Sequence, residues 1–306
     1  MIGGIVEVAE SGRHLSVYRG FMRVKEDGAE LGRAPLDDIS ALILSGPQVS
    51  LSKNLLVELA ERKAVVVTCG RNWHPVSLTL PFDAHHQSAG VLHDQIAAST
   101  PLKKRLWQIL VRAKIDNQRS ILEHHHPGNP KSNELAILSR RVKSGDPENM
   151  EAQAARHYWT ALMGENFRRD RFGEDANSYL NYGYTVLRAA TARAVCAAGL
   201  HPSLGLHHGS RINAFALVDD LMEPFRPMVD SIAYELSIEV GNPEASLAPE
   251  NKRRLVAILQ QDMVAEKGAS PLINCLGRLA QSLTAAFAEK QASLELPELP
   301  PPGHLL

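Results

Sequence analysis

Over about the first 95 residues, short apolar runs rich in β-branched and aromatic side chains alternate with glycine-containing breaks, a pattern typical of β-strands. The run at 64–69 is apolar throughout, as expected for a strand covered on both faces. The pattern predicts strands over residues 5–8, 15–18, 21–24, 39–44, 64–69 and 76–80. Residues 50–63 carry leucines at helical spacing, so we expect one helix among the strands.

From residue 89 onward, apolar positions recur every three or four residues, which indicates α-helices. Pro101 stands at the start of the first long helix, for which Thr100 is the predicted N-cap. Helices are predicted over residues 101–122, 132–143, 149–163, 178–198, 211–222, 228–239, 250–266 and 271–289. In this part of the chain, strand character is confined to a short stretch at 236–240.

Together the two patterns predict an α+β protein. A small β-rich N-terminal domain (1–95) is followed by a larger all-α domain (96–290). Residues 291–306 are rich in proline and are predicted to form an extended tail. Pro297 and Pro300 form a PxxP pattern of the kind that docks in aromatic grooves, but we expect a frayed terminus here.

The composition is that of an ordinary folded protein, with 306 residues of which 44% are hydrophobic and 22% are charged. The first residues lack a basic region followed by an apolar run, and no uncharged apolar run approaches the ~18 residues of a membrane span. We therefore expect neither a signal peptide nor a membrane helix. Cys69, Cys196 and Cys275 lie far apart, which excludes a disulfide scaffold or a zinc ribbon and favours a reducing, cytoplasmic setting.

The charge of the chain is unevenly distributed. The net charge of −1 argues mildly against a protein that binds nucleic acid. Residues 103–143, however, hold ten Lys and Arg against three Asp and Glu, a local net charge of +7. This stretch is either a solvated helix surface or a face that attracts an acidic partner, and composition leaves both interpretations open.

Several familiar motifs are absent from the sequence: it contains no P-loop, no GxSxG and no HExxH. The histidines at 85–86 and 124–126 have no Cys or acidic residue at a recognised ligand spacing, so we interpret them as surface or phosphate-contacting residues. Gly183, inside a predicted helix, indicates a close approach of another helix or a ligand, and helix packing is the favoured interpretation.

The richest chemistry lies around residues 206–227. Asp220 and Glu223 are one helical turn apart and share a face, where two carboxylates repel each other unless a cation or a proton offsets them. His208 precedes them in a loop that can fold back over the helix end. Carboxylates with an imidazole suit Mn²⁺ or Mg²⁺ with open water positions. An acidic helix surface beside a loop histidine is the alternative interpretation.

A further carboxylate, Glu151, lies near the start of a predicted helix, on the same side as Ala154, Ala155 and Tyr158. This face of small residues is suited to close packing, and a buried carboxylate there needs a partner. A metal ion would serve, and so would Arg156 or Arg188. The spacing of the residues does not choose among these partners.

Taken in order, these fragments resemble one family. They are PLDDI at 35–39, Trp107 with KIDNQ at 114–118, NMEA at 149–152, LNYGY at 180–184, GLHH at 205–208, NAF at 213–215 and DDLMEPFRP at 219–227. Their order and spacing closely resemble the CRISPR adaptation integrase, a metal-dependent endonuclease that inserts new spacers into CRISPR arrays. The resemblance covers residues 1–290, and the variant of the last motifs is similar to integrases of type II systems.

This resemblance implies a β-sandwich-like N-terminal domain used in dimerisation, an α-helical catalytic domain and a homodimer. It also implies that Glu151, His208 and Glu223 are the catalytic metal ligands for Mg²⁺ or Mn²⁺. Asp220, one helical turn before Glu223, becomes a plausible supporting residue or additional ligand. None of the three ligand positions departs from the family pattern, so nothing marks the chain as an inactive copy.

The implied reaction is attack by the 3′-hydroxyl of a DNA fragment on a phosphodiester at the edge of a CRISPR repeat. Because a spacer can have any sequence, DNA has to be held by its backbone, through Lys and Arg. The candidate contacts are Lys103, Lys104, Arg105, Arg112, Lys114, Arg119, Arg168 and Arg169. The implied partners are DNA, a second copy of the chain, a small ferredoxin-like adaptation protein and the RNA-guided effector nuclease. The alternatives are a stand-alone nuclease acting on branched DNA in repair and a non-catalytic DNA-binding scaffold.

Overall fold

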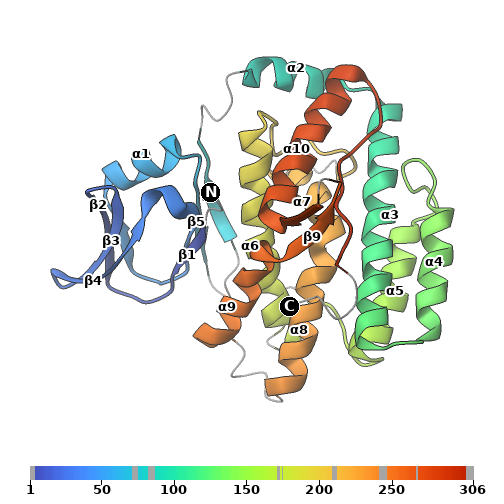
Figure 1. Cartoon of the computed structure of the whole chain (residues 1–306), viewed down its shortest axis with the longest axis horizontal. Coiled ribbons are helices and arrows are strands. Elements are labelled where there is room, and N and C mark those ends of the chain that lie inside the picture. Colours follow the sequence, from blue (N-terminus) through green and yellow to red (C-terminus); the bar gives the residue numbers. More distant parts are fainter. Residues whose placement is uncertain are drawn as a thin grey trace.

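A computed structural model describes residues 4–70, 75–81, 87–170, 173, 175–208, 212–240, 247–266 and 268–300. The predicted histidine pair at 85–86 lies outside these residues. The chain forms a strand-rich N-terminal part and a larger helical part that pack side by side (Figure 1). Within the described residues, no helix combines the length and the apolar composition that crossing a membrane requires.

The N-terminal part is a sandwich of two four-stranded sheets. In the first sheet, the first three strands are parallel and the fourth is antiparallel, in the order β1 (Gly4–Val8), β5 (Ile39–Leu44), β7 (Val65–Cys69) and β8 (Pro75–Thr79). The second sheet is antiparallel except at its last pair, in the order β4 (Ala29–Pro35), β3 (Phe21–Glu26), β2 (Arg13–Tyr18) and β6 (Val49–Leu51).

The first sheet is covered on both faces, which explains why its central strands are apolar throughout. Leu42 and Val66 face the sandwich core together with Leu55 and Leu59 of α1 (Lys53–Glu61). Ile43, like the other alternate residues of these strands, faces the core of the helical part. The sheet is therefore the layer through which the two parts of the molecule share their cores.

The helical part is built around α6 (Ala176–Ala197), which packs against α8, α9, α10 and the first sheet (Figure 1). Most of its side chains are buried, which accounts for a sequence that is apolar or small all round. The other elements are η1 (Leu36–Asp38), α2 (Ser88–Ala97), α3 (Thr100–His125), α4 (Pro130–Arg141), α5 (Met150–Met163), α7 (Ala216–Met222), η3 (Glu223–Phe225), α8 (Arg226–Val240), α9 (Pro249–Ala257), η5 (Ile258–Gln260), β9 (Asp262–Ala265), β10 (Gly268–Pro271) and α10 (Leu272–Glu289).

The predicted fold class is confirmed, with several local corrections. The predicted helix at 250–266 is wrong after Ala257, because β9 and β10 form an antiparallel hairpin that buries Met263, so the helical part is not purely α. Residues 236–240 belong to α8 and not to a strand. The first long helix begins one residue early: Ser99 is its N-cap and accepts a hydrogen bond from the Leu102 amide.

Residues 291–300 are extended as predicted, but they are not frayed. Glu298 pairs with Val264 in a short antiparallel bridge. Leu294, Leu296 and Leu299 pack against the helical core. The described part of the tail is thus a packed strap, and the PxxP residues Pro297 and Pro300 belong to it.

Candidate active site

An open cavity of about 760 Å³ lies among α3, α5, α6 and the segment from α7 to α8. Its lining is mainly charged or polar and includes Lys114, Gln118, Arg169, Asn181, Tyr184, Arg188, His208, Asn213, Asp219, Glu223, Arg226 and Asp230. Two of the three predicted ligands, His208 and Glu223, line it directly. Glu151 reaches it through Lys114, as the following contacts show.

Glu151 is held by the start of α5. Asn149 is the N-cap in a left-handed conformation (φ 53°), and its side chain accepts from the Ala152 amide. The Asp146 carboxylate accepts from the amides of Met150 (2.8 Å) and Glu151 (3.0 Å). These caps fix the first turn, so the Glu151 side chain leaves the helix in a defined direction.

Lys114 of α3 lies between the two predicted acidic ligands. Its Nζ is 2.6 Å from Glu151 Oε1 and 2.6 Å from Glu223 Oε2. Burial alone would lower the pKa of Lys114, but the charges of Glu223 and Glu151 outweigh it and raise that pKa. The ammonium therefore stays charged and joins two carboxylates that would otherwise repel each other.

Glu223 has a second cationic partner. Arg226, one helical turn further on, places Nε 2.8 Å from Glu223 Oε1. Burial would raise the pKa of Glu223, but Arg226 and Lys114 together lower it. This buried carboxylate is thus ionised, as a metal ligand has to be.

His208 is positioned by Asp220. The buried Asp220 carboxylate lies 2.5 Å from His208 Nδ1 and accepts from the amides of Leu206 (2.6 Å) and His207 (3.1 Å). Its hydrogen bond raises the pKa of His208. With Nδ1 engaged, Nε2 is the ring nitrogen left for a cation, the arrangement in which a carboxylate orients a ligating histidine.

The loop that carries His208 is fitted closely to the helices beside it. A Cβ at Gly205 would lie 2.9 Å from Asp220 Oδ2 and 2.8 Å from the His208 carbonyl oxygen, so only glycine fits. The His207 ring stacks on Trp107 of α3 at 4.5 Å between centroids. The GLHH motif and Trp107 are distant in sequence, but these contacts place them side by side in the structure.

The structure thus brings the three predicted ligands into one region, although not into a closed metal site. Among the described residues, the group whose three possible ligand atoms all lie within 4.8 Å of one another is His124, His125 and Glu235, not the predicted trio. Two carboxylates meeting one ammonium, with an oriented imidazole on the same cavity, nevertheless fit a divalent cation. In this structure the Lys114 ammonium supplies the positive charge between the two carboxylates.

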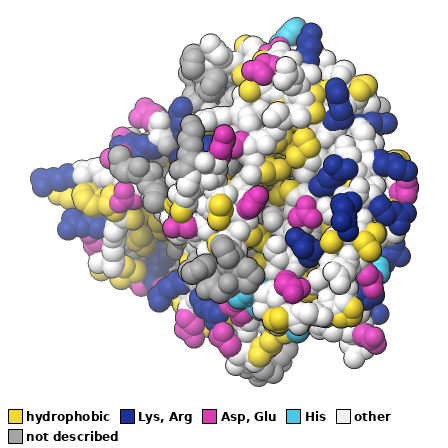
Figure 2. Space-filling model, turned by 45° about the vertical axis from the view of Figure 1, so that its right-hand side comes forward, with side chains coloured by type: hydrophobic (Ala, Val, Ile, Leu, Met, Phe, Trp, Pro, Cys, Tyr) yellow, Lys and Arg dark blue, Asp and Glu magenta, His cyan; other side chains and the backbone are white. Residues whose placement is uncertain are grey.

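One candidate DNA contact, Lys114, lies in the cavity and not on the exposed face of α3. Lys114 was expected on a DNA-binding surface, but its side chain is only 12% exposed and is engaged by Glu151 and Glu223. In contrast, Lys104, Arg105, Arg112 and Arg119 are exposed on α3, and Lys103 is partly exposed. Figure 2, in which the side of α3 and α4 comes forward, shows Lys and Arg side chains gathered on that side of the molecule.

The predicted pair Arg168 and Arg169 is divided between two environments. Arg168 is exposed and donates to the carbonyl oxygens of Glu165 and Phe167. Arg169 lines the cavity, where it donates to Asn181 Oδ1 (2.7 Å).

Sequence reasoning named Arg169 and Arg188 but did not predict that they line one cavity with Arg226. Arg226 and Arg169 lie over the same Tyr184 ring, at 4.7 and 5.3 Å from its centroid. Arg188 pairs with Asp219 and not with Glu151. A usable signal existed for Arg226, since it is one helical turn from Glu223. Arg169 comes from a loop, and nothing in its local pattern indicated the cavity.

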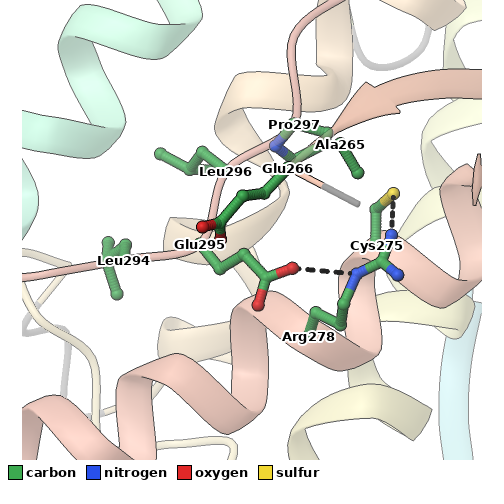
Figure 3. Close-up of a pocket in the computed structure, with 8 residues that line it drawn as sticks. All are labelled: Ala265, Glu266, Cys275, Arg278, Leu294, Glu295, Leu296 and Pro297. Atoms are coloured by element: carbon green, nitrogen blue, oxygen red, sulfur yellow. Dashed lines mark hydrogen bonds and ion pairs between the residues drawn. The ribbon is translucent and has the colours of Figure 1, made fainter. Parts of the chain in front are cut away.

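The remaining sequence candidates have structural roles. A Cβ at Gly183 would lie 2.4 Å from Val229 Cγ1, so this glycine serves helix packing, as interpreted. The cysteines are free, and burial raises the pKa of Cys69 and Cys196 to about 11. A small cavity of about 170 Å³ lies beside Cys275. Figure 3 shows that Arg278 contacts both the Cys275 sulfur and Glu295 of the packed strap.

Comparison with known proteins agrees with this fold. The structure resembles a casposase bound to its integration product (TM-score 0.80, 19% identity, 95% of this chain and 92% of that one). It also resembles a chain of a Cas6-RT-Cas1–Cas2 complex (TM-score 0.78, 20% identity, 97% and 36% of the two chains). At these identities the two likenesses establish the fold.

Sequence comparison establishes the family. The family model "CRISPR associated protein Cas1" matches residues 6–239. The chain is 37% identical over 294 residues to the CRISPR-associated endonuclease Cas1 of Neisseria meningitidis, and the aligned region covers 95% of each protein. The chain therefore belongs to the Cas1 family of CRISPR-associated endonucleases.

Proposed function

We propose that this protein is a metal-dependent DNA integrase that inserts new spacer DNA into a CRISPR array. The observation that carries this function is the convergence of Glu151 and Glu223 on one buried ammonium, beside a histidine oriented by Asp220. In a Cas1 family member, that arrangement fits a divalent-cation site for phosphodiester chemistry. The same proposal assigns Glu151, His208 and Glu223 as catalytic metal ligands.

In the proposed reaction, the 3′-hydroxyl of an incoming fragment attacks a phosphodiester at the repeat edge and displaces a 3′-oxygen. One phosphodiester bond forms as another breaks, so no ATP is needed. Bound to the three ligands, Mg²⁺ or Mn²⁺ supplies Lewis-acid polarisation of the phosphate and offsets charge in the transition state. Asp220 keeps Nδ1 of His208 occupied and so holds its other ring nitrogen toward the site.

Lys114 has two roles in this proposal. Without a divalent ion, its ammonium holds Glu151 and Glu223 together and, with Arg226, lowers the pKa of Glu223. If the two carboxylates held a divalent ion, Lys114 would stay in the cavity as a cation that could pair with a DNA phosphate. Arg226 and Arg169 stay stacked on Tyr184, so they offer fixed positive charge to the same phosphate.

DNA of any sequence is held through its phosphates, and the exposed basic residues of α3 are the proposed contacts. They are Lys103, Lys104, Arg105, Arg112 and Arg119, with Arg168 near the cavity. Arg112 also donates to the Val142 carbonyl oxygen (2.9 Å), which fixes its position on the surface. We further propose a homodimer, a small ferredoxin-like partner and, in a type II system, help from the effector nuclease. The structural similarity to a chain of the Cas6-RT-Cas1–Cas2 complex supports the proposal of a small partner.

A strand-transfer assay tests the function. A labelled fragment with a free 3′-hydroxyl is incubated with the full chain and a supercoiled plasmid that carries a repeat, in Mg²⁺, Mn²⁺ or EDTA, with and without the small partner. We expect joining in either metal and none in EDTA. Because the removal of outer partners of a metal ligand already costs about 10–100-fold, Glu223→Gln and His208→Asn should each lower the rate by about 100-fold or more.

The control is Glu148→Gln. Glu148 is an exposed residue that pairs with Lys143 and lies just before α5, the helix that carries Glu151, so this variant should leave joining unchanged. Joining at the normal rate by Glu223→Gln would overturn the site assignment. Metal-dependent cutting of branched DNA without any joining would favour the repair nuclease. DNA binding with neither cutting nor joining would identify a scaffold.

A further inference from the structure

A second cluster of possible metal ligands lies apart from the candidate active site. His124 and His125 are the last two residues of α3, and Glu235 lies on α8. One ligand atom from each lies within 4.8 Å of the other two. His124 is ten residues beyond Lys114 on the same helix, about 15 Å along its axis, so the cluster is separate from the cavity that holds Lys114.

Each of the three side chains is already directed by a neighbour. His125 Nε2 lies 2.7 Å from Ser231 Oγ and 4.0 Å from Glu235 Oε1. The His125 ring also packs on Tyr234 at 4.7 Å between centroids. His124 meets the His125 ring edge-on, again at 4.7 Å. The two imidazoles therefore face α8 rather than bulk solvent alone.

The two oxygens of Glu235 have different surroundings. Oε2 pairs with Arg254 Nη2 at 3.1 Å, whereas Oε1 faces His125. Arg254 also pairs with Glu239, so two carboxylates share one guanidinium and leave one negative charge. The carbonyl end of α3 adds a partial negative charge at the same place. The electrostatics of the cluster thus favour a cation.

We propose that His124, His125 and Glu235 form a second, separate cation site for a borderline transition metal such as Zn²⁺. Two imidazoles and one carboxylate are a ligand set that Zn²⁺ takes with a water in the fourth position. The Glu235 side chain is 23% exposed and that of His125 is 8% exposed, and none of the three residues is fully buried, so an ion can reach the edge of the cluster and small rotations can bring the ligand atoms to bonding distance. Hard ions that prefer oxygen ligands are disfavoured by this set.

Such an ion would link the end of α3 to α8. Both helices also line the candidate active site, through Lys114 on α3 and through Arg226 and Asp230 on α8. Zn²⁺ bound at the cluster should therefore raise the thermal stability of the helical part by binding the folded state alone. This site does not depend on the proposed DNA chemistry.

The test uses the metal-free full chain in excess Mg²⁺, which occupies oxygen-rich sites. Zn²⁺ binding is measured by calorimetry, and Co²⁺ is used as a spectroscopic probe whose visible absorption reports four-coordinate binding. We expect one ion per chain, an increase of Tm with Zn²⁺, and at least about tenfold weaker binding in His124→Gln and in Glu235→Gln.

Two controls separate this site from its surroundings. His126→Gln alters the next histidine, which contacts the Leu162 carbonyl oxygen instead, and should bind Zn²⁺ as the parent does. His208→Gln alters the candidate active site and should also leave this binding intact. The proposal is overturned if the parent binds no Zn²⁺ in Mg²⁺, or if His124→Gln and Glu235→Gln bind it as tightly as His126→Gln.

Discussion

Lys114 joins two of the three proposed metal ligands through one ammonium group. Its ammonium is within 2.6 Å of carboxylates from α5 and η3, and it is only 12% exposed. Such a buried pair is costly to break, because removal of one partner leaves an uncompensated charge. A divalent ion that enters this place has to compete with Lys114.

We expect Lys114→Met to strengthen Mn²⁺ binding at the candidate site by about tenfold, because the competing charge is gone. The metal-free variant should be less stable by about 3–5 kcal/mol, since the buried Glu223 and the partly buried Glu151 lose their shared partner. Calorimetry and urea unfolding measure the two effects. The control is Lys131→Met, which removes a partly exposed ammonium paired with Glu134. Unchanged or weaker Mn²⁺ binding in Lys114→Met would contradict the competition.

Asp230 is a second residue whose environment has a measurable consequence. It is buried, and the Tyr184 hydroxyl donates to it. Burial outweighs this hydrogen bond and the charge of Arg226 and raises the pKa of Asp230 to about 7. The folded state therefore binds a proton that the unfolded state releases near pH 4, and this contribution to stability is lost as the pH rises toward 7.

Asp230→Asn removes this titration. As the pH rises from 5 to 7, the unfolding free energy of the variant should increase by about 2 kcal/mol relative to that of the parent, since one unit of pKa difference is worth ~1.4 kcal/mol. Urea unfolding at several pH values measures the difference. A difference between variant and parent that stays constant over this range would show that Asp230 ionises normally.

At the scale of elements, α6 is the helix around which the cavity is built. Gly183 lies where α6 meets α8, and its missing Cβ leaves room for Val229. Val229 precedes Asp230, so this contact also sets the position of the Tyr184–Asp230 pair. The close packing at Gly183 therefore helps to position Tyr184 and Asp230, which line the cavity of the candidate active site.

Gly183→Ala should destabilise the fold by about 1–3 kcal/mol, because the new methyl group meets a stiff, buried valine. Gly277→Ala is the matched control: it lies within α10, where nothing stands within 4 Å of the added Cβ, and should stabilise by about 0.5–1 kcal/mol. Thermal unfolding compares the two variants. Equal effects would mean that α6 and α8 are not in close contact.

The sequence predicted helices and strands well where the apolar residues followed a single spacing. The continuous apolar runs of β5 and β7 and the long amphipathic α3 are examples. The β9–β10 hairpin was missed because apolar residues up to Met263 keep helical spacing, while their pairing and burial come from distant neighbours. The packed strap at 291–300 was missed for the same reason.

The candidate site was predictable only in part. Asp220 and Glu223 were visible as a pair, because one helix carries both. The sequence spacing did not identify the partner of Glu151. In the structure this partner is Lys114, which lies on α3, whereas Glu151 lies on α5. Contacts between separate elements depend on tertiary packing, which no local periodicity contains.

At the scale of the whole molecule, the strand-rich and helical parts are linked by charge as well as by apolar packing. Glu7 of β1 accepts from the Tyr182 hydroxyl (2.6 Å) and pairs with Lys252 of α9 (3.1 Å). The exposed basic residues of α3 lie on another side of the helical part. Although the net charge is −1, basic side chains are concentrated on one face of the protein, as Figure 2 shows.

If that face holds DNA through phosphates, Arg105→Ala combined with Arg119→Ala should weaken binding equally for unrelated sequences. The slope of log K against log salt should fall by about 2, since each lost phosphate contact removes ~0.9. Fluorescence anisotropy over a salt series measures it. Lys53→Ala, exposed on α1, should leave the slope unchanged. A loss confined to one sequence would contradict binding through the backbone.

The central claim is that Glu151, His208 and Glu223 close around one divalent ion. Anomalous scattering from crystals grown in Mn²⁺ tests it most directly. The account predicts a single strong peak bonded to these three side chains, with the Lys114 ammonium moved away from Glu151 and Glu223. A cavity without such a peak, in which Lys114 still joins the two carboxylates, would contradict it.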